Sequence, residues 1–321
     1  MKRIIIDTDP GIDDAFALLY AVACGQFDLA GVTTVFGNAS VQTTTRNALW
    51  LLEQLGQPGI PVARGSAAPL SGRVHVPPVH IHGQEGFGPF PPRTPRGQPL
   101  AENAADFMAR TAATDRGNVT IIALGPLTNV AEALTRHPGF AADVGEIIVM
   151  GGAFETAGNK RAYVEDNISN VAQAACIVAE SHARTSFVGL DITNRILLSS
   201  TDIQSIAHSV HPDLSDFIQK IGAYYIDFYA SKGMMDGAGL HDPATIIAAH
   251  DPGLFDWHQG RIDVSTSGAQ SGRTRLVSGS GSCRAALDAD LDGIKSQFMS
   301  VLINSATAAT EHAPSKAGAS R

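Results

Sequence analysis

The sequence is poor in the features that mark several large classes of protein. It has three cysteines, Cys24, Cys176 and Cys283, and this odd number at wide spacing favours reduced thiols over a disulfide or zinc framework. No apolar stretch reaches the roughly 18–20 residues that cross a bilayer. No signal-peptide pattern precedes the first strand-like segment. We therefore expect a cytoplasmic protein without a membrane partner.

Clusters of basic residues and the common nucleotide motifs are absent as well. The net charge is -8, which argues against a nucleic-acid partner because no basic surface is available to neutralise phosphates. The sequence has no Walker A loop, GxGxxG turn, GxSxG elbow or HExxH helix. These absences exclude the commonest nucleotide-cofactor enzymes and hydrolases.

What the chain does contain is a regular alternation of apolar runs and amphipathic stretches. This pattern predicts strands at 3–6, 29–35, 119–124, 146–150 and 185–190. It predicts helices at 13–24, 41–55, 102–115, 127–136, 171–183 and 212–230. Continuously apolar strands between helices are typical of a mostly parallel central sheet flanked by helices.

The C-terminal part of the sequence predicts a small antiparallel extension of that sheet. Its short strands are expected at 261–266, 273–278 and 284–290. We find no internal repeat and no interdomain linker. The expected architecture is therefore a single α/β domain at 1–304, followed by a flexible tail at 305–321 that is rich in Ala, Ser, Thr and Pro.

Two long loops and the ends of the strands carry the unusual polar residues. The loop at 66–100 holds eight of the 17 prolines, and the loop at 231–241 is rich in glycine. A loop as long as the first is usually functional or disordered. Polar residues also follow each of the five main strands. Since ligands of open α/β sheets bind at the carboxyl ends of the strands, this edge is the predicted site.

Four aspartates lie within eight residues directly after the first strand: Asp7, Asp9, Asp13 and Asp14. One of them alone could simply favour a helix N-terminus. Together they require neutralisation, and oxygen ligands indicate a hard cation such as Ca²⁺ or Mg²⁺. A phosphotransferase with an aspartate nucleophile begins with a similar string, but it needs a hydroxyl where this chain has Gly11.

The first long loop contains an HxH pair, His80 and His82. The pair could bind zinc, yet no third or fourth ligand lies nearby in the sequence. A glycine-rich loop that carries His82 could instead act as a lid that contacts substrate.

Two further groups of residues have both a structural and a functional interpretation. Asn159, Glu165 and Asn167 could hold sugar hydroxyls through paired hydrogen bonds, or could be ordinary turn residues. Asp242 lies before a proline at a predicted helix start, where aspartate is a common cap. Its neighbour His241 can titrate near neutrality, which gives the pair added interest.

Taken together, these strings resemble the inosine-uridine-preferring nucleoside hydrolases, from residue 4 to about 290. The segments that carry the resemblance are DTDPGxDDA at 7–15, Phe36-Gly37-Asn38, His82-Gly83, LGPLTN at 124–129, MGGAF at 150–154, Glu165-x-Asn167 and His241-Asp242-Pro243. They follow in the family's order and at its spacing. The resemblance implies the nucleoside hydrolase fold and hydrolysis of uridine, inosine or cytidine to ribose and a free base.

The resemblance also implies a Ca²⁺ ion and its ligands. These are the carboxylates of Asp9, Asp14 and Asp242 and the main-chain carbonyl of Leu124, with Asp7 supporting them. Asp9 would in addition be the general base that takes a proton from the water held on the ion. His241 would be the best candidate to protonate the leaving base, with His82, Tyr225 and Tyr229 as alternatives.

The remaining implied residues contact the substrate. The 2′- and 3′-hydroxyls of the ribose would be bound by Asp13, Asn38 and Asn167, and the 5′-hydroxyl by Asn159 and Glu165. Met150 would line the ribose pocket and His82 would flank the base. Dimers and tetramers occur in the family, so the resemblance also implies a homodimer or homotetramer.

Some positions depart from the family pattern. Asp166 replaces an apolar or aromatic residue, Asn194 replaces a common histidine, and Asn170-Val171 replaces Asp-Pro. None is an implied metal ligand, so we expect activity, but the preferred base does not follow from the sequence. A rival hypothesis is a nucleoside- or ribose-binding protein without turnover. The intact aspartates argue against it, because binding alone needs no general base.

Overall fold

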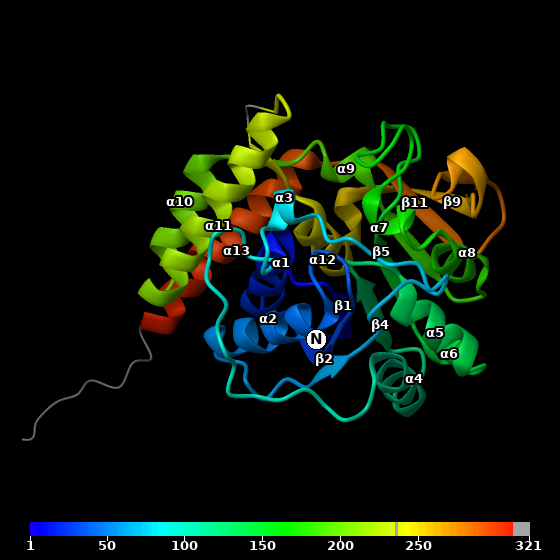
Figure 1. The fold of residues 1–321 in the computed structure, drawn as a ribbon, viewed down its shortest axis with the longest axis horizontal. Coiled ribbons are helices and arrows are strands. Elements are labelled where there is room, and N and C mark those ends of the chain that lie inside the picture. Colours follow the sequence, from blue (N-terminus) through cyan, green and yellow to red (C-terminus); the bar gives the residue numbers. More distant parts are fainter. Residues whose placement is uncertain (235–236, 311–321) are drawn as a thin grey trace, which may run out of the picture.

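The computed structural model describes residues 1–234 and 237–310, and within them nine strands form one sheet (Figure 1). These strands are β1 (Lys2–Thr8), β2 (Phe27–Thr34), β3 (Val62–Arg64), β4 (Val119–Ala123), β5 (Glu146–Met150), β6 (Thr185–Val188), β9 (Phe255–Val264), β10 (Thr274–Ser278) and β11 (Cys283–Ala289). Their order across the sheet is β10-β9-β11-β6-β5-β4-β1-β2-β3. Strands β7 (Leu197–Leu198) and β8 (Ala238–Gly239) form a separate antiparallel pair.

All neighbouring strands from β3 to β11 run parallel, whereas β9 and β10 are antiparallel to their neighbours. This confirms the predicted parallel sheet with a small antiparallel extension. The five main predicted strands and the three C-terminal ones are all present. Strand β3 and the first half of β9 are additional, since they are short or carry too many polar residues to be recognised from hydrophobicity.

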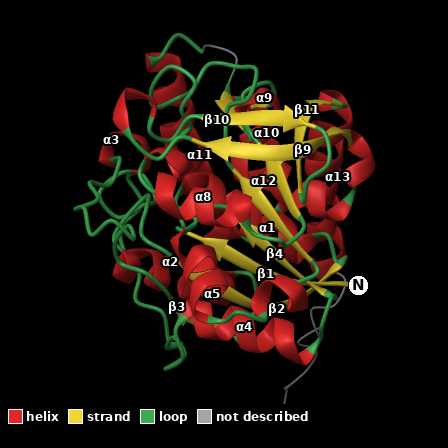
Figure 2. Cartoon of the chain, turned by 90° about the vertical axis from the view of Figure 1, so that its right-hand side faces the viewer, coloured by secondary structure: helices red, strands yellow, loops and turns green. Residues whose placement is uncertain are grey.

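Helices cover both faces of the sheet (Figure 2). They are α1 (Ile12–Ala23), α2 (Val41–Gln54), α3 (Val79–His82), α4 (Ala104–Thr114), α5 (Thr128–Arg136), α6 (Phe140–Asp143), α7 (Asp166–Ser169), α8 (Ala172–Glu180), α9 (Leu190–Thr193), α10 (Ser200–Ser209), α11 (Pro212–Ser231), α12 (His241–His250) and α13 (Leu291–Thr310). All six predicted helices are confirmed within two or three residues at each end.

Successive side chains of the central strands point to opposite faces, and each face has its own hydrophobic core. Ile4 and Ile6 of β1 pack with α1, α2, α10, α11, α12 and α13. Ile5 packs on the other face with α4, α5, α6 and α8. Because both faces are buried, the strand residues are apolar without alternation, which is the pattern that the sequence shows.

Helices α10 and α13 were not among the predicted elements. Helix α10 begins with a capping box, in which Ser199 accepts from the N–H of Asp202 and the Asp202 carboxylate accepts from the N–H of Ser199. Helix α13 continues to Thr310, so it includes the start of the predicted tail at 305–321; residues 311–321 lie outside the described residues. The domain boundary at 304 stays a prediction.

The long proline-rich loop runs from β3 to α4 and contains the short helix α3. The side-chain amide of Asn47 donates to the carbonyls of Pro10 and Glu85, at 3.1 and 2.8 Å. These bonds hold the loop over the start of α1. The loop therefore brings His82, the last residue of α3, to the carboxyl edge of the sheet.

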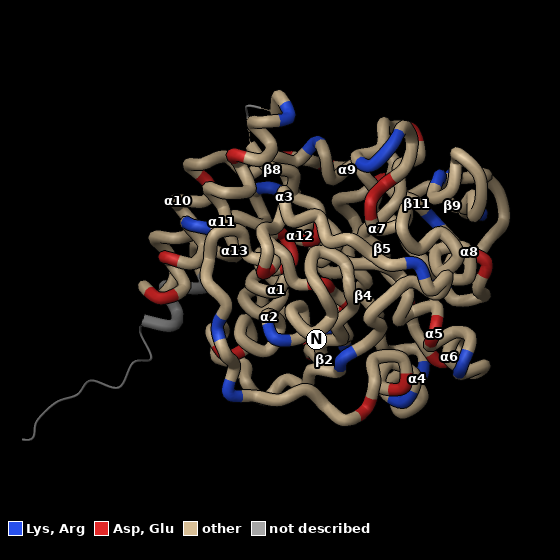
Figure 3. Tube along the Cα trace, viewed as in Figure 1, with Lys and Arg blue, Asp and Glu red and all other residues tan. Residues whose placement is uncertain are grey.

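Charged residues are unevenly distributed over this fold. In Figure 3, acidic positions gather near the centre of the view beside α1 and α12, while basic positions lie mostly at the periphery. Among residues 1–234 and 237–310, no helix combines the length and apolar character needed to cross a membrane.

Candidate active site

The turn between β1 and α1 is organised by the side chain of Asp14. Its Oδ2 atom accepts hydrogen bonds from the backbone N–H of Gly11 and from Nδ2 of Asn38, each at 2.9 Å. Its Oδ1 atom accepts from the backbone N–H of Asp9 at 3.2 Å and from the Thr8 hydroxyl. The carboxylate also lies in the first turn of α1, where the helix dipole favours it. Asp14 thus fixes the loop that carries Asp9.

Three buried carboxylates from distant parts of the chain meet beside this turn. Asp13, Asp14 and Asp242 each offer an oxygen atom, and the three atoms lie within 4.8 Å of one another. Asp242 comes from the first turn of α12, and none of the three side chains is more than 9% exposed. Of the predicted metal ligands, Asp14 and Asp242 belong to this cluster. Asp13, predicted to bind ribose, belongs to it as well.

Asp9 lies on the same pocket, outside the cluster of three, and its carboxylate is enclosed by two glycines. The backbone N–H of Asn38 donates to its Oδ2 atom at 2.7 Å. A Cβ atom on Gly37 would lie 2.0 Å from Oδ2, and one on Gly125 would lie 2.2 Å from Oδ1. Both glycines follow strand ends in the sequence, and their function is to leave room for this carboxylate.

Replacing Gly37 by alanine should therefore move the Asp9 carboxylate. Because a displacement of about 1 Å at a reacting group costs on the order of 100-fold in rate, we expect kcat to fall by about that factor. Gly59→Ala is the matched control, since no atom lies within 4 Å of a Cβ at that position. Steady-state kinetics of both variants test this, and a wild-type kcat in Gly37→Ala would contradict it.

The electrostatics of the carboxylates favour a bound cation. Burial, reinforced by the charge of Asp14, raises the pKa of Asp13 to about 8 and raises the pKa of Asp9 well above its usual range. Burial and the charge of Asp13 likewise raise the pKa of Asp242. The Oδ1 atom of Asp13 is buried and has no hydrogen-bond partner among the described residues. A hard divalent cation would satisfy this atom and neutralise the repulsion, so the donor set fits one.

Asn167 links the other side of the pocket to the strand ends. Its Nδ2 atom donates to the carbonyl of Leu124 at 2.7 Å and to the carbonyl of Met150 at 3.3 Å. The Leu124 carbonyl, predicted as a metal ligand, therefore faces the pocket and accepts a hydrogen bond there. Met150 lines the pocket with its thioether near the same amide, at 3.4 Å.

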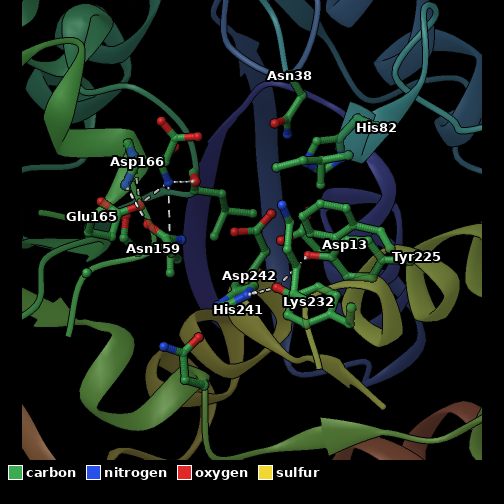
Figure 4. A pocket seen from close by; sticks show the side chains of 18 of the residues that line it. Asp13, Asn38, His82, Asn159, Glu165, Asp166, Tyr225, Lys232, His241 and Asp242 are labelled. Atoms are coloured by element: carbon green, nitrogen blue, oxygen red, sulfur yellow. Dashed lines mark hydrogen bonds between the residues drawn. The ribbon is translucent and has the colours of Figure 1, made fainter. Parts of the chain in front are cut away.

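Glu165 caps the short helix α7 from inside the pocket. Its carboxylate accepts from the backbone N–H groups of Asn167 at 2.7 Å and Ile168 at 3.0 Å. Burial nevertheless raises the pKa of Glu165 to about 7. The Oδ1 atom of Asn159 accepts from the N–H of Asp166 at 3.0 Å, which brings Asn159 beside Glu165 (Figure 4). The two residues predicted for the ribose 5′-hydroxyl thus lie together.

Both predicted histidines line the pocket and both are neutral at pH 7. Burial lowers the pKa of His82 to about 3 and that of His241 to about 4. The N–H of Ile12 donates to Nδ1 of His82 at 3.2 Å, so the proton of this imidazole is on Nε2. His241 is bonded through both nitrogens, to the Thr193 hydroxyl at 2.8 Å and to the Tyr229 hydroxyl at 2.5 Å.

These residues enclose a cavity of about 470 Å³ (Figure 4). Every residue predicted to bind the metal or the substrate lines it except Asp14. Asp7, predicted to support the metal ligands, does not line it either; its Oδ1 atom accepts from the Thr33 hydroxyl at 2.7 Å and from Nδ2 of Asn129 at 2.8 Å. Sequence reasoning did not assign the other lining residues to a site, since none belongs to a recognisable motif; they include Ile81, Thr156, Gly158, Phe228, Lys232 and Met234. Asn194, which differs from the family pattern, also lines the cavity.

Asp191 supports one wall of this cavity without lining it. Its carboxylate accepts from the backbone N–H of Phe154 at 2.9 Å and of Glu155 at 2.7 Å. The following residues, from Thr156 to Asn159, line the pocket. The polar residue after strand β6 thus shapes the loop that carries Asn159.

The sequence and the fold have close counterparts among known proteins. A family model described as inosine-uridine preferring nucleoside hydrolase matches residues 4–296. The chain is 40% identical to "Probable uridine nucleosidase 2" of Arabidopsis thaliana, over 86% of this chain and 85% of the relative.

Solved structures of nucleoside hydrolases share the fold of this chain. The chain matches a plant nucleoside hydrolase, the PpNRh1 enzyme, with a TM-score of 0.89 and 32% identity, over 94% of this chain and 99% of the other. It matches a purine-preferring ribonucleoside hydrolase from Gardnerella vaginalis with a TM-score of 0.91 and 28% identity, over 96% and 100% of the two chains.

Proposed function

Since this chain belongs to the inosine-uridine preferring nucleoside hydrolase family and is a nucleoside hydrolase, we propose that it uses Ca²⁺ to release ribose and a free base from uridine and related ribonucleosides. The family is metal-dependent. The observation that carries the proposal is the buried carboxylate cluster in the wall of a cavity of nucleoside size. Pure binding of a nucleoside would not require such a costly concentration of negative charge.

Ca²⁺ fits the donor set better than other common ions. It accepts six to eight oxygen ligands in flexible geometry, whereas Mg²⁺ retains several waters and thiolate or imidazole ligands would favour zinc. We assign the ion to Asp9, Asp14, Asp242 and the carbonyl of Leu124. When bound, the ion would act as a Lewis acid that makes a water molecule easier to deprotonate and neutralises the surrounding carboxylates.

Asp9 is our candidate for the general base. Its carboxylate is fixed between Gly37 and Gly125, and burial raises its pKa, which makes it a stronger base than an exposed carboxylate. In the reaction a water molecule gives a proton to Asp9 and its oxygen bonds to C1′ of the ribose. The electron pair of the C1′–N bond leaves with the base.

The remaining polar residues would hold the ribose and stabilise its positive charge. Asp13, Asn38 and Asn167 are placed to bind the 2′- and 3′-hydroxyls, and Asn159 and Glu165 the 5′-hydroxyl. Breaking an N-glycosidic bond develops oxocarbenium character on the sugar. Carboxylates that are already fixed around this position stabilise that charge without reorganisation.

The leaving base must gain a proton, and the hydrogen bonds of His241 suggest how. In the tautomer with its proton on Nε2, His241 accepts from Thr193 and donates to the Tyr229 oxygen. The Tyr229 proton is then free to move to the nitrogen of the base, while His241 stabilises the phenolate that remains. Asp9 afterwards releases to solvent the proton that it took from water, and Tyr229 regains one, so the protons balance over one turnover. His241 therefore acts through Tyr229, while the Nε2–H of His82 is available to donate to the base.

Tyr229→Phe tests this relay. Loss of the proton donor should lower kcat for uridine by about 100-fold, in the range typical of general acid catalysis. Hydrolysis of 4-nitrophenyl β-D-ribofuranoside should fall much less, because its leaving group is stable as an anion. Tyr224→Phe, which changes a partly exposed tyrosine on the same helix, serves as the control. Equal losses with both substrates would remove Tyr229 from the acid role.

The names of the relatives support uridine as the first substrate to examine. The Arabidopsis relative is named as a uridine nucleosidase, whereas the Gardnerella structure is of a purine-preferring enzyme with lower identity. We also propose a homodimer or homotetramer, from the family alone, and a cytoplasmic location, from the three widely spaced cysteines.

The function itself is tested by incubating the purified protein with uridine, inosine and cytidine in the presence of Ca²⁺. Separation of the products by chromatography should show free base and ribose in equal amounts. If no nucleoside of the panel releases a base, the proposed function is wrong.

A further inference from the structure

The candidate active site contains one positively charged side chain, that of Lys232. Among the described residues that line the cavity, it is the only lysine or arginine. It shares the cavity with five carboxylates, those of Asp9, Asp13, Glu165, Asp166 and Asp242. Four of these carboxylates have proposed roles toward the metal or the ribose, and the fifth, Asp166, pairs with Lys160 at 3.0 Å. The lysine has no such role and requires an explanation.

Lys232 also differs from the other lysines in its pairing. Lys2, Lys160, Lys220 and Lys295 each have a carboxylate within 4.0 Å, at 3.8, 3.0, 2.8 and 2.8 Å. Within residues 1–234 and 237–310, Lys232 has no such partner, and its Nζ atom lies 5.6 Å from the ring centre of Phe228. With respect to the part of the chain that the structure describes, its ammonium group therefore keeps its three donors for a ligand.

The position of Lys232 identifies the part of the ligand that it would meet. It is the residue directly after α11, the helix that also contributes Tyr225, Phe228 and Tyr229 to the cavity. In Figure 4, Lys232 and Tyr225 lie on one side of the cavity, and Glu165 and Asn159 lie on the opposite side. Since Glu165 and Asn159 are assigned to the ribose 5′-hydroxyl, Lys232 belongs to the base end.

Lys232 is exposed, so it lies at the rim of the cavity and not at its floor. The carboxylates of Asp9, Asp13 and Asp242 are buried and form the floor, so under the proposed function the reacting ribose carbon would lie there. The edge of the base that is furthest from C1′ therefore points toward the rim. In uracil and hypoxanthine this edge carries an oxo group, whereas in cytosine and adenine the same position carries an amino group.

We propose that Lys232 is a specificity residue that selects nucleosides with an oxo group on this edge, such as uridine and inosine, over their amino counterparts. The inference rests on the proposed function and names its substrate class. The ammonium group donates a hydrogen bond to the oxo oxygen and cannot accept one from an amino group. When the C1′–N bond breaks, the electron pair stays with the base and spreads onto this oxygen, where the positive charge stabilises it.

The test compares uridine with cytidine, which differ at this position. We expect the wild-type protein to prefer uridine in kcat/KM. Lys232→Met should lower kcat/KM for uridine by about 10- to 100-fold, the range for a hydrogen bond to a charged group, and change cytidine less than about threefold. Lys232→Arg should recover most of the uridine activity. Lys220→Met, on the same helix and paired with Asp216 at the surface, should leave the ratio unchanged.

The outcomes separate this inference from the proposed function. The inference alone is overturned if the wild-type protein hydrolyses uridine and Lys232→Met has the same ratio of kcat/KM for uridine to kcat/KM for cytidine. An equal loss on both substrates would also overturn it, because it would show a general or structural role. If the wild-type protein releases no base from either nucleoside, the proposed function falls and the inference falls with it. Thermal unfolding of each variant verifies that the comparison is between folded proteins.

Discussion

Asp9→Asn should lower kcat for uridine by about 1,000-fold or more and leave the fold intact. General-base catalysis contributes about 10²–10⁴-fold, and an amide cannot take the proton from water. The substitution keeps the shape of a side chain that is enclosed by two glycines. It also removes one of several buried carboxylates whose pKa values are raised by burial and, secondarily, by mutual repulsion, so we expect no loss in thermal stability. Steady-state kinetics and circular dichroism during heating measure the two effects.

The matched control for this substitution is Asp28→Asn. Asp28 lies on β2 at the surface, 3.8 Å from Arg3, and exposed ion pairs of this kind contribute about 1 kcal/mol or less. Its kcat should equal that of the wild type. Substantial residual turnover in Asp9→Asn would assign the general base to another group. Loss of turnover together with a collapse of the fold would show that Asp9 is structural.

Removal of divalent cations with a chelator should abolish uridine hydrolysis, and added Ca²⁺ should restore it. Without a cation, burial and like charges raise the pKa of Asp13 and of Asp242, which opposes the charged forms that the reaction needs. The ion should also stabilise the native state by about 2.7 kcal/mol at a free concentration 100 times its dissociation constant. Activity and melting temperature, titrated with Ca²⁺ in parallel, test both expectations.

Asp242→Asn provides the internal control for the metal experiment. This variant loses one charge of the cluster, so its melting temperature should respond much more weakly to Ca²⁺. Mg²⁺ at the same concentration should restore less activity than Ca²⁺, because it holds its waters more tightly. Full activity of the chelated wild-type protein would refute the metal dependence of this chain.

The fold was predictable to a large extent because its strands are buried on both faces. Runs such as Ile4-Ile5-Ile6 are continuously apolar, and this pattern is typical of parallel sheets. The elements that escaped prediction have weaker local signals. Strand β3 has three residues, and the first half of β9 carries several exposed polar residues and pairs on one side only, with β11. Their assignment depends on pairing with neighbours that are distant in sequence.

The site residues that belong to motifs of the family could be predicted from the sequence. The contacts that depend on the folded geometry could not. The aspartates and asparagines followed from the resemblance and from their positions after strands. The sequence could not show that Gly37 and Gly125 enclose Asp9, or that both nitrogens of His241 are occupied. It also gave no reason to single out Lys232, since only the folded structure shows that this residue lines the cavity and has no carboxylate partner among residues 1–234 and 237–310.

The separation of the two halves of the carboxylate cluster has a consequence for how the protein folds. Asp14 belongs to the first helix and Asp242 to the twelfth, so a cation held by both would cross-link the chain across about seven-tenths of its length. Closing a loop of that size in an unfolded chain costs conformational entropy. An ion therefore cannot bind tightly until folding has brought the two ends of the loop together. Ca²⁺ would then bind late in folding, only to chains whose first and last thirds have already packed together.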